Sequence, residues 1–156
     1  LQAVRTGGVD IELAFVGAPS TSDLGINDDI VRAARDDAAL TWMTDASDAD
    51  VQRLIDEADV FLSFGIEGFG IPVVEAVRRG TPVLFGGTQP AAEALVGVGA
   101  FDVGGDDVDA ISCSLRDYAS PSSVQTITRA VEPLLVPQWR DFAQGLQDVV
   151  AQVKRR

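Results

Sequence analysis

The chain has 156 residues, a formal net charge of −12 and a hydrophobic content of 46%. This length fits one domain with a sizeable core, and the negative charge argues against nucleic acid as a partner, because phosphate binding needs cations. Histidine is absent and Cys113 is the one cysteine, so an internal disulfide and Ser-His or Cys-His catalysis are excluded. We expect no metal site and no cofactor.

Hydrophobic patterning along the chain predicts an α/β fold, a Rossmann-like parallel sheet flanked by helices, because short β-rich runs alternate with helical patterns. The predicted strands cover residues 11–17, 40–44, 60–64, 83–85 and 100–103. The first of them is mostly apolar and closes in a glycine turn, which predicts a buried strand. Asn27 is expected to cap the helix that follows it, with Ile30, Val31 and Ala34 on the inner face.

Capping patterns mark the later helices. Ser47 and Asp50 have the spacing of a capping box, and Pro72 and Gly80 suit the first turn and the exit of the next helix. A short helix is predicted over 89–96. Two further helices are expected to begin at Asp106 and at the Ser-Pro pair of residues 120–121, and a last amphipathic helix covers about 138–154.

The start of the chain suggests that the sheet is incomplete. Residues 1–4 resemble the end of a helix, whereas a doubly wound sheet begins with a strand. We therefore expect residues 1–156 to form one domain of a two-domain protein, with the first strand of this domain missing upstream. No apolar run is long enough to cross a membrane and no signal segment is visible, so a cytoplasmic location is expected.

A glycine-rich segment lies between the third predicted strand and the next helix, where ligands of open parallel sheets bind. Its glycines allow the backbone to approach a ligand closely. Amides at the N-terminus of that helix favour an anion such as a diphosphate. These amides belong to Gly68, Phe69, Gly70 and Ile71.

Two glutamates flank this segment. Glu67 lies on the loop, and Glu75 lies about one turn into the helix, where its carboxylate can accept hydrogen bonds from both hydroxyls of a ribose. Anion-binding amides beside a diol-binding carboxylate describe a site for a nucleoside diphosphate. Either half by itself is a weak signal, because an isolated surface glutamate is usually only solvated.

The combined pattern resembles a known family. Residues 67–76, EGFGIPVVEA, followed by RGTPV at 79–83, resemble the donor-site motif of the retaining glycosyltransferases of family 4, which have the two-domain GT-B architecture. Asp59 to Ser63 before the motif, Glu93 after the following strand and Trp139 in the closing helix agree with it. The resemblance covers roughly residues 10–150 and implies the C-terminal, donor-binding domain of such an enzyme.

The resemblance implies roles for individual residues. Glu75 would hold the donor ribose, Glu67 would act at the reacting end of the sugar diphosphate, and the amides of Gly68, Phe69, Gly70 and Ile71 would hold the diphosphate. Thr44, with its neighbours Met43 and Asp45, would lie against the base. The implied partners are a nucleotide-sugar donor, an acceptor-binding N-terminal domain and, for the intact enzyme, a membrane that it contacts peripherally.

One departure from the family concerns its cations. The family usually places an Arg and a Lys on the diphosphate, from the end of the domain's first strand and the segment after it, and that region is not part of this sequence. The lone lysine, Lys154, lies at the other end of the chain. This chain by itself is therefore not expected to catalyse transfer.

Several alternatives remain open from the sequence. The chain could be a catalytically inactive module that binds a nucleotide sugar, or an interaction domain that uses Trp139 and Phe142 of its last helix. A nucleotide-sugar epimerase ranks low because it usually needs a histidine. The aspartates near residue 106 lack the loop spacing of a calcium site, so caps and turns explain them better. Cys113 is expected to be a small packed residue. High alanine and arginine with scarce lysine suggest a bacterial source.

Overall fold

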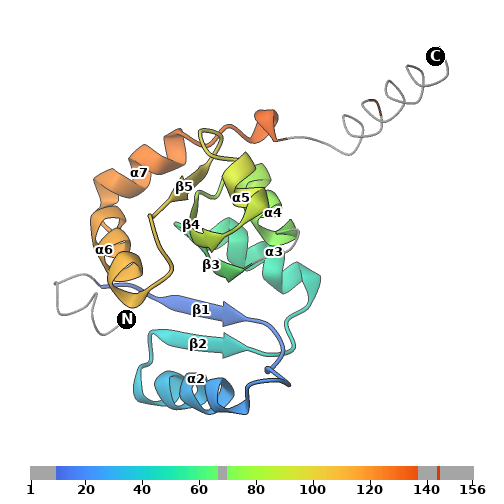
Figure 1. The fold of residues 1–156 in the computed structure, drawn as a ribbon, viewed down its shortest axis with the longest axis vertical. Helices are drawn as coiled ribbons and strands as arrows, with labels where there is room; N and C mark the ends of the chain where they lie inside the picture. The colour runs from blue at the N-terminus through green and yellow to red at the C-terminus, as the bar shows by residue number, and fades with distance from the viewer. Residues whose placement is uncertain (1–9, 67–69, 137–143, 145–156) are drawn as a thin grey trace.

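The computed structural model describes residues 10–66, 70–136 and 144 (Figure 1). Strands and helices alternate along this part of the chain, as the hydrophobic pattern predicted. The elements are β1 (Leu13–Val16), α2 (Leu24–Asp36), β2 (Leu40–Met43), α3 (Asp48–Glu57), β3 (Phe61–Ile66), α4 (Ile71–Arg79), β4 (Val83–Thr88), α5 (Pro90–Ala94), β5 (Ala100–Asp102), α6 (Val108–Tyr118), α7 (Pro121–Arg129) and the 3₁₀ helix η1 (Pro133–Leu135).

Every strand pairing within the described residues is parallel, which confirms the α/β, Rossmann-like fold. The strands form two sheets, with the order β1-β2 in one and β3-β4-β5 in the other. In Figure 1, β1 lies between β2 and the three-stranded sheet, and α6 and α7 lie near the β5 end. None of the described helices combines the length and the hydropathy that crossing a bilayer requires. The expected last helix and residues 1–4 lie outside the described residues.

The central strands are longer than predicted. β3 and β4 continue together through the pairs Gly65↔Gly87 and Ile66↔Thr88, beyond the predicted ends at residues 64 and 85. Glycine has low β propensity, which favoured an early end, but pairing with a neighbouring strand overrides that preference. A Cβ on Gly87 would lie 2.4 Å from the carbonyl oxygen of Gly65, so glycine permits a backbone approach that no other residue allows.

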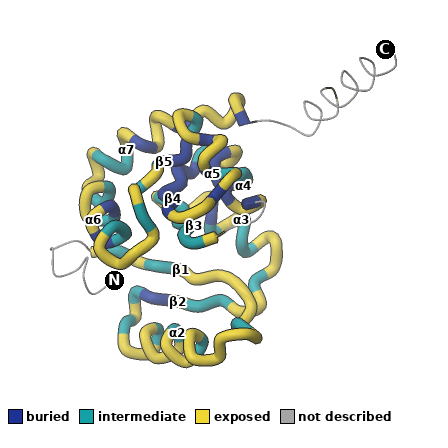
Figure 2. The backbone as a smooth tube through the Cα atoms, in the orientation of Figure 1, coloured by how far each residue is buried: buried dark blue, intermediate teal, exposed yellow. Residues whose placement is uncertain are grey.

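The core lies between α4 and the three-stranded sheet. The inner strand β4 is buried on both faces, as expected for a parallel strand with neighbours on either side. Figure 2 shows this burial concentrated on β4, β5 and α4. The residues that are at most 1% exposed include Val73, Ala76 and Val77 of α4, Val83, Leu84 and Phe85 of β4, Ala92 of α5 and Ala100 of β5.

Most predicted helix ends are confirmed, and two are corrected. The Ser47 capping box is complete, with the Asp50 carboxylate accepting from the Ser47 backbone amide at 3.1 Å. Gly80 ends α4 in the left-handed conformation, and Ser120 caps α7.

Asn27 is not a cap. α2 begins one turn earlier with Asp23 as its N-cap, and the Asn27 amide instead bonds to both backbone groups of Ser20. Asp107 rather than Asp106 caps α6, because its carboxylate reaches the Ala110 amide at 2.9 Å. Both errors arise because neighbouring Asp and Asn residues are equivalent as caps in sequence.

The expectation of a buried first strand is wrong. Phe15 and Val16 of β1 are 40% and 42% exposed, and Val31, which was expected on the inner face of α2, is 55% exposed. β1 pairs with β2 on one side and has no paired strand on the other within the described residues. The side chains of a strand point to the two faces of the sheet, so an apolar run is buried only where other elements cover both faces.

Candidate functional site

The glycine-rich segment leaves the carboxyl end of β3 and enters α4, as the sequence predicted. Gly65 (φ 91°) and Ile66 are the last residues of β3, and Gly70 is the N-cap of α4. The carboxyl ends of β3, β4 and β5 share one edge of the sheet because the three strands are parallel. Three of the predicted site residues, Glu67, Gly68 and Phe69, lie outside the described residues.

Among the described residues, no side chain caps the N-terminus of α4. Gly70 adopts the left-handed conformation (φ 67°, ψ 38°) and provides no side-chain cap. The Ile71 and Val73 amides belong to the first turn, where no intrahelical acceptor is available, and Pro72 between them lacks a donor. Ile71 is 54% exposed, whereas the N-cap Gly70 and Val73 are buried, so the start of the helix is only partly exposed. Free amides with the positive end of the helix dipole favour an anion.

Glu75 lies exposed on α4, one turn after Ile71. Among the described residues, no hydrogen bond or ion pair engages its carboxylate, although its charge contributes to raising the pKa of Arg79. The main cause of that pKa shift is the hydrogen bond from the Arg79 guanidinium to Asp56 on α3. Glu75 is therefore available to accept hydrogen bonds from a ligand.

Part of the motif has a structural explanation. Arg79 makes two hydrogen bonds to the carboxylate of Asp56, which ties α4 to α3 and lowers the pKa of Asp56. The buried Thr81 lies between α4 and β4 and donates its hydroxyl to the Ile55 carbonyl of α3 at 2.8 Å. This hydrogen bond is a second link between α3 and the end of α4. Arg79 is exposed but paired, so its place in the motif is explained by the contact between α3 and α4. Residues 79–83 hold the sheet and helices in place rather than facing a ligand.

Gln89 positions the end of β3, a role that sequence reasoning missed. It is 1% exposed, accepts from the Ser63 hydroxyl at 3.0 Å and donates to the Gly65 carbonyl at 3.2 Å. Its backbone amide donates to Glu93 at 3.3 Å. A buried amide side chain must have both donors and acceptors satisfied, so this network fixes the backbone from which the glycine segment starts. A glutamine just before a short helix gives no sequence signal for this contact.

Thr44 is exposed and lies directly after β2, which ends one residue before the predicted end of that strand. β2 belongs to the two-stranded sheet, and no hydrogen bond or ion pair within the described residues joins Thr44 to α4. The structure thus brings Gly70, Ile71 and Glu75 together on one helix start, whereas it does not connect Thr44 to them.

Comparisons with known proteins identify no family. Neither a scan against protein-family models nor a search of curated protein sequences finds a match to this chain. The structure establishes the α/β class, and the resemblance to a glycosyltransferase depends on the sequence pattern alone.

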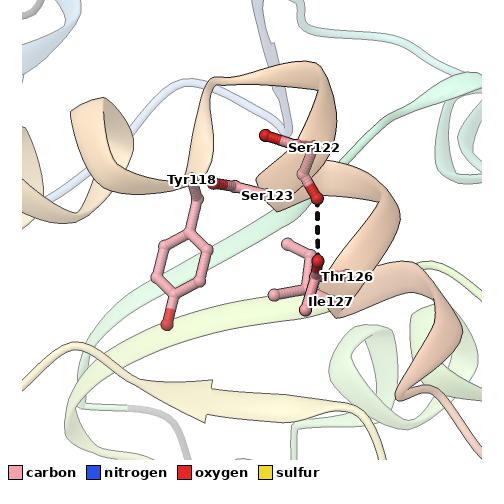
Figure 3. A pocket seen from close by; sticks show the side chains of 5 residues that line it. All are labelled: Tyr118, Ser122, Ser123, Thr126 and Ile127. Carbon is pink, nitrogen blue, oxygen red and sulfur yellow. Dashed lines mark hydrogen bonds between the residues drawn. The ribbon is translucent and has the colours of Figure 1, made fainter.

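A shallow hollow of about 220 Å³ lies elsewhere, at the junction of α6 and α7 (Figure 3). Two of its hydroxyls are engaged within α7 and its cap, since Thr126 donates to the Ser122 carbonyl at 2.8 Å and the Ser123 hydroxyl accepts from the Ser120 hydroxyl at 2.8 Å. None of its lining side chains is charged. The lining residues are Tyr118, Ser122, Ser123, Thr126 and Ile127. This hollow offers a ligand little to bind.

Two other candidates from the sequence have local explanations. Asp102 accepts from the Gly104 amide at 2.8 Å and Asp107 caps α6, so the expected turn and cap roles are confirmed for these aspartates. Cys113 was expected to be packed, but it is exposed on α6 with its sulfur 3.9 Å from Asp117. The face of α6 that it occupies is turned away from the buried Ser112 and Ser114.

Proposed function

We propose that this chain is the donor-binding part of a retaining glycosyltransferase that moves a hexose from a nucleoside diphosphate sugar to an acceptor hydroxyl. The observation that carries the proposal is the position of Gly70, Ile71 and Glu75. They lie at the start of one helix, at the carboxyl end of a parallel sheet, where the motif requires them. The acceptor would bind to a second domain, and this part alone would not transfer sugar.

The start of α4 supports binding of the diphosphate. Within the described residues, no side chain caps the Ile71 and Val73 amides, and the N-terminus carries the partial positive charge of the helix. The leaving group of the reaction is a diphosphate, whose negative charge grows as the glycosidic bond breaks. Donors that are already oriented toward that charge lower the barrier, because they need no reorganisation during the reaction.

Glu75 supports recognition of the ribose. Its carboxylate is exposed one turn beyond the free amides and has no hydrogen-bond partner among the described residues. A carboxylate accepts from two neighbouring hydroxyls with charge-assisted hydrogen bonds, and a ribose offers such a pair. In this proposal Glu67 acts at the sugar end of the donor, and transfer with retention needs no protein nucleophile.

The test is isothermal titration of the chain with UDP, GDP and ADP. We expect one of them to bind with a dissociation constant of millimolar or lower. Loss of charge-assisted hydrogen bonds worth about 1.5–3 kcal/mol in Glu75→Ala should weaken that binding by roughly 10- to 100-fold. Glu132→Ala is the matched control, because Glu132 is an exposed glutamate outside α4 and should leave affinity unchanged.

Two results would contradict the proposal. One is that none of the three nucleotides binds, and the other is that the Glu75 variant binds as tightly as the parent chain. Nucleotide binding without sugar transfer, when an acceptor-binding domain is present, would instead favour the inactive nucleotide-sugar-binding module.

A further inference from the structure

Within the described residues, four strand edges have no paired strand, those of β1, β2, β3 and β5, and the edges of β1 and β3 are the two that face each other between the sheets (Figure 1). β1 is bonded to β2 on one side, β3 is bonded to β4 on one side, and no ladder joins β1 to β3 within the described residues. Figure 1 shows β1 on the side of β2 that faces the three-stranded sheet. Open edges of apolar strands attract further strands, and folded proteins normally cover them.

The backbone of β1 shows which groups are unpaired. The Leu13 amide donates to Ala39 at 2.7 Å and the Gly17 amide to Met43 at 3.0 Å, both toward β2. Because the two sides of a strand alternate along a parallel ladder, the intervening Ala14 and Val16 amides point away from β2.

The same alternation applies to β3. The Phe61 amide donates to the Pro82 carbonyl at 2.9 Å, toward β4. The amides of Leu62 and Phe64 therefore point away from β4, toward the side on which no strand is paired. Each edge thus offers at least two amide donors and the carbonyls of the same residues.

Exposure of apolar side chains points to the same gap. All four residues of β1, Leu-Ala-Phe-Val, are apolar, yet none is buried, and no residue of β3 is fully buried. In β4, which has a neighbour on each side, Val83, Leu84 and Phe85 are at most 1% exposed. Figure 2 shows this contrast between β1 and β4. Strands that are apolar on both faces belong in the interior of a parallel sheet.

The strand order identifies the occupant. Doubly wound sheets have the order 3-2-1-4-5-6, in which strands 2 and 4 flank strand 1. The observed orders, β2-β1 and β3-β4-β5, match 3-2 and 4-5-6 if one strand lies between β1 and β3. That strand is the first of the series, so it precedes β1 in the polypeptide.

We propose that the gap between β1 and β3 binds one β-strand, apolar on both faces and parallel to its neighbours, supplied by a segment of the same polypeptide that precedes β1. A second copy of the chain fits less well. The unpaired edges of two copies related by a twofold axis would meet antiparallel, whereas the gap needs one strand parallel to both sides. The inference concerns the sheet and does not depend on what α4 binds.

A synthetic strand tests the proposal. Residues 1–156 are mixed with the peptide Lys-Lys-Val-Ile-Val-Leu-Val-Lys-Lys, and amide hydrogen exchange is followed by NMR. In the chain alone, the amides of Ala14, Val16, Leu62 and Phe64 should exchange rapidly. At a peptide concentration 100 times its dissociation constant, their exchange should slow by up to about 100-fold. The control peptide, with proline in place of the Ile and the Leu, lacks two donors and should have no effect.

Two variants of β1 make the test specific. Ala14→Pro removes an amide that faces the gap, so the β1–β2 pairing should survive while the peptide no longer slows exchange at Val16 and Leu62. Phe15→Pro removes an amide that faces β2 and should disrupt that pairing.

Three results would overturn the proposal. The first is that the four amides are already protected in the monomeric chain, because twelve residues before β1 are too few for a strand and the crossover of a dozen or more residues that a parallel neighbour needs. The second is that they become protected only as the chain dimerises, which would assign the edges to a second copy. The third is that neither strand responds to the peptide.

Discussion

Replacing Gln89 with leucine tests how the end of β3 is held. The variant keeps the volume of the side chain but removes the acceptor for the Ser63 hydroxyl and the donor to the Gly65 carbonyl. Each hydrogen bond contributes about 0.5–1.5 kcal/mol net, and Gln89 is 1% exposed, so water does not replace the lost partners at that position. The expected loss is about 2 kcal/mol, or about 4–8 °C in Tm for a chain of this length.

Thermal and urea unfolding of four proteins provide the assay: the parent chain, Gln89→Leu, Ser63→Ala and the double variant. Ser63→Ala should cost about 1 kcal/mol or more, because it leaves the buried amide oxygen of Gln89 without a donor. In the double variant that oxygen no longer exists, so the two losses should be less than additive by about 1 kcal/mol. Additive losses, or a Gln89→Leu variant as stable as the parent, would refute the reasoning.

Two further predictions concern the same region. Gly86→Ala should destabilise the chain by more than about 2 kcal/mol, because its Cβ would lie 1.8 Å from the Gly105 carbonyl oxygen. A Cβ on Gly97 would meet no atom, so Gly97→Ala should cost only about 1–2 kcal/mol of backbone strain from its positive φ of 81°. Equal unfolding midpoints for the two variants would contradict this. The hydrogen bonds from Arg79 hold the pKa of Asp56 below its usual range. The pair therefore stabilises the fold above about pH 4, and this stabilisation is lost as the pH falls through the lowered pKa of Asp56. Carboxyl NMR titration should show the Asp56 pKa rising toward its ordinary value in Arg79→Gln, and an unchanged pKa would show that the ion pair is absent in solution.

Local sequence patterns fixed most of the secondary structure. The capping box at Ser47, the proline start of α7 and the glycine end of α4 depend on residues within one turn, so they can be recognised without knowing the fold. The start of α4 after β3 and the position of Glu75 one turn into that helix were also predictable, because a strand followed by glycines and a proline-started helix is a local arrangement. Where two equivalent caps lie close together, as at Asp106 and Asp107, the sequence could not choose between them.

The tertiary structure decided what depends on neighbours distant in the chain. β3 and β4 continue through glycines because each strand completes the other's hydrogen bonds, and Gln89 is buried because Ser63 and Gly65 need its amide. Arg79 serves the α3–α4 contact because Asp56 lies opposite it. The exposure of β1 has the same kind of cause, since an apolar strand is buried only when both of its sides are covered. Sequence alone determined which segments form strands and helices, and only the packed structure showed which edges and side chains they share.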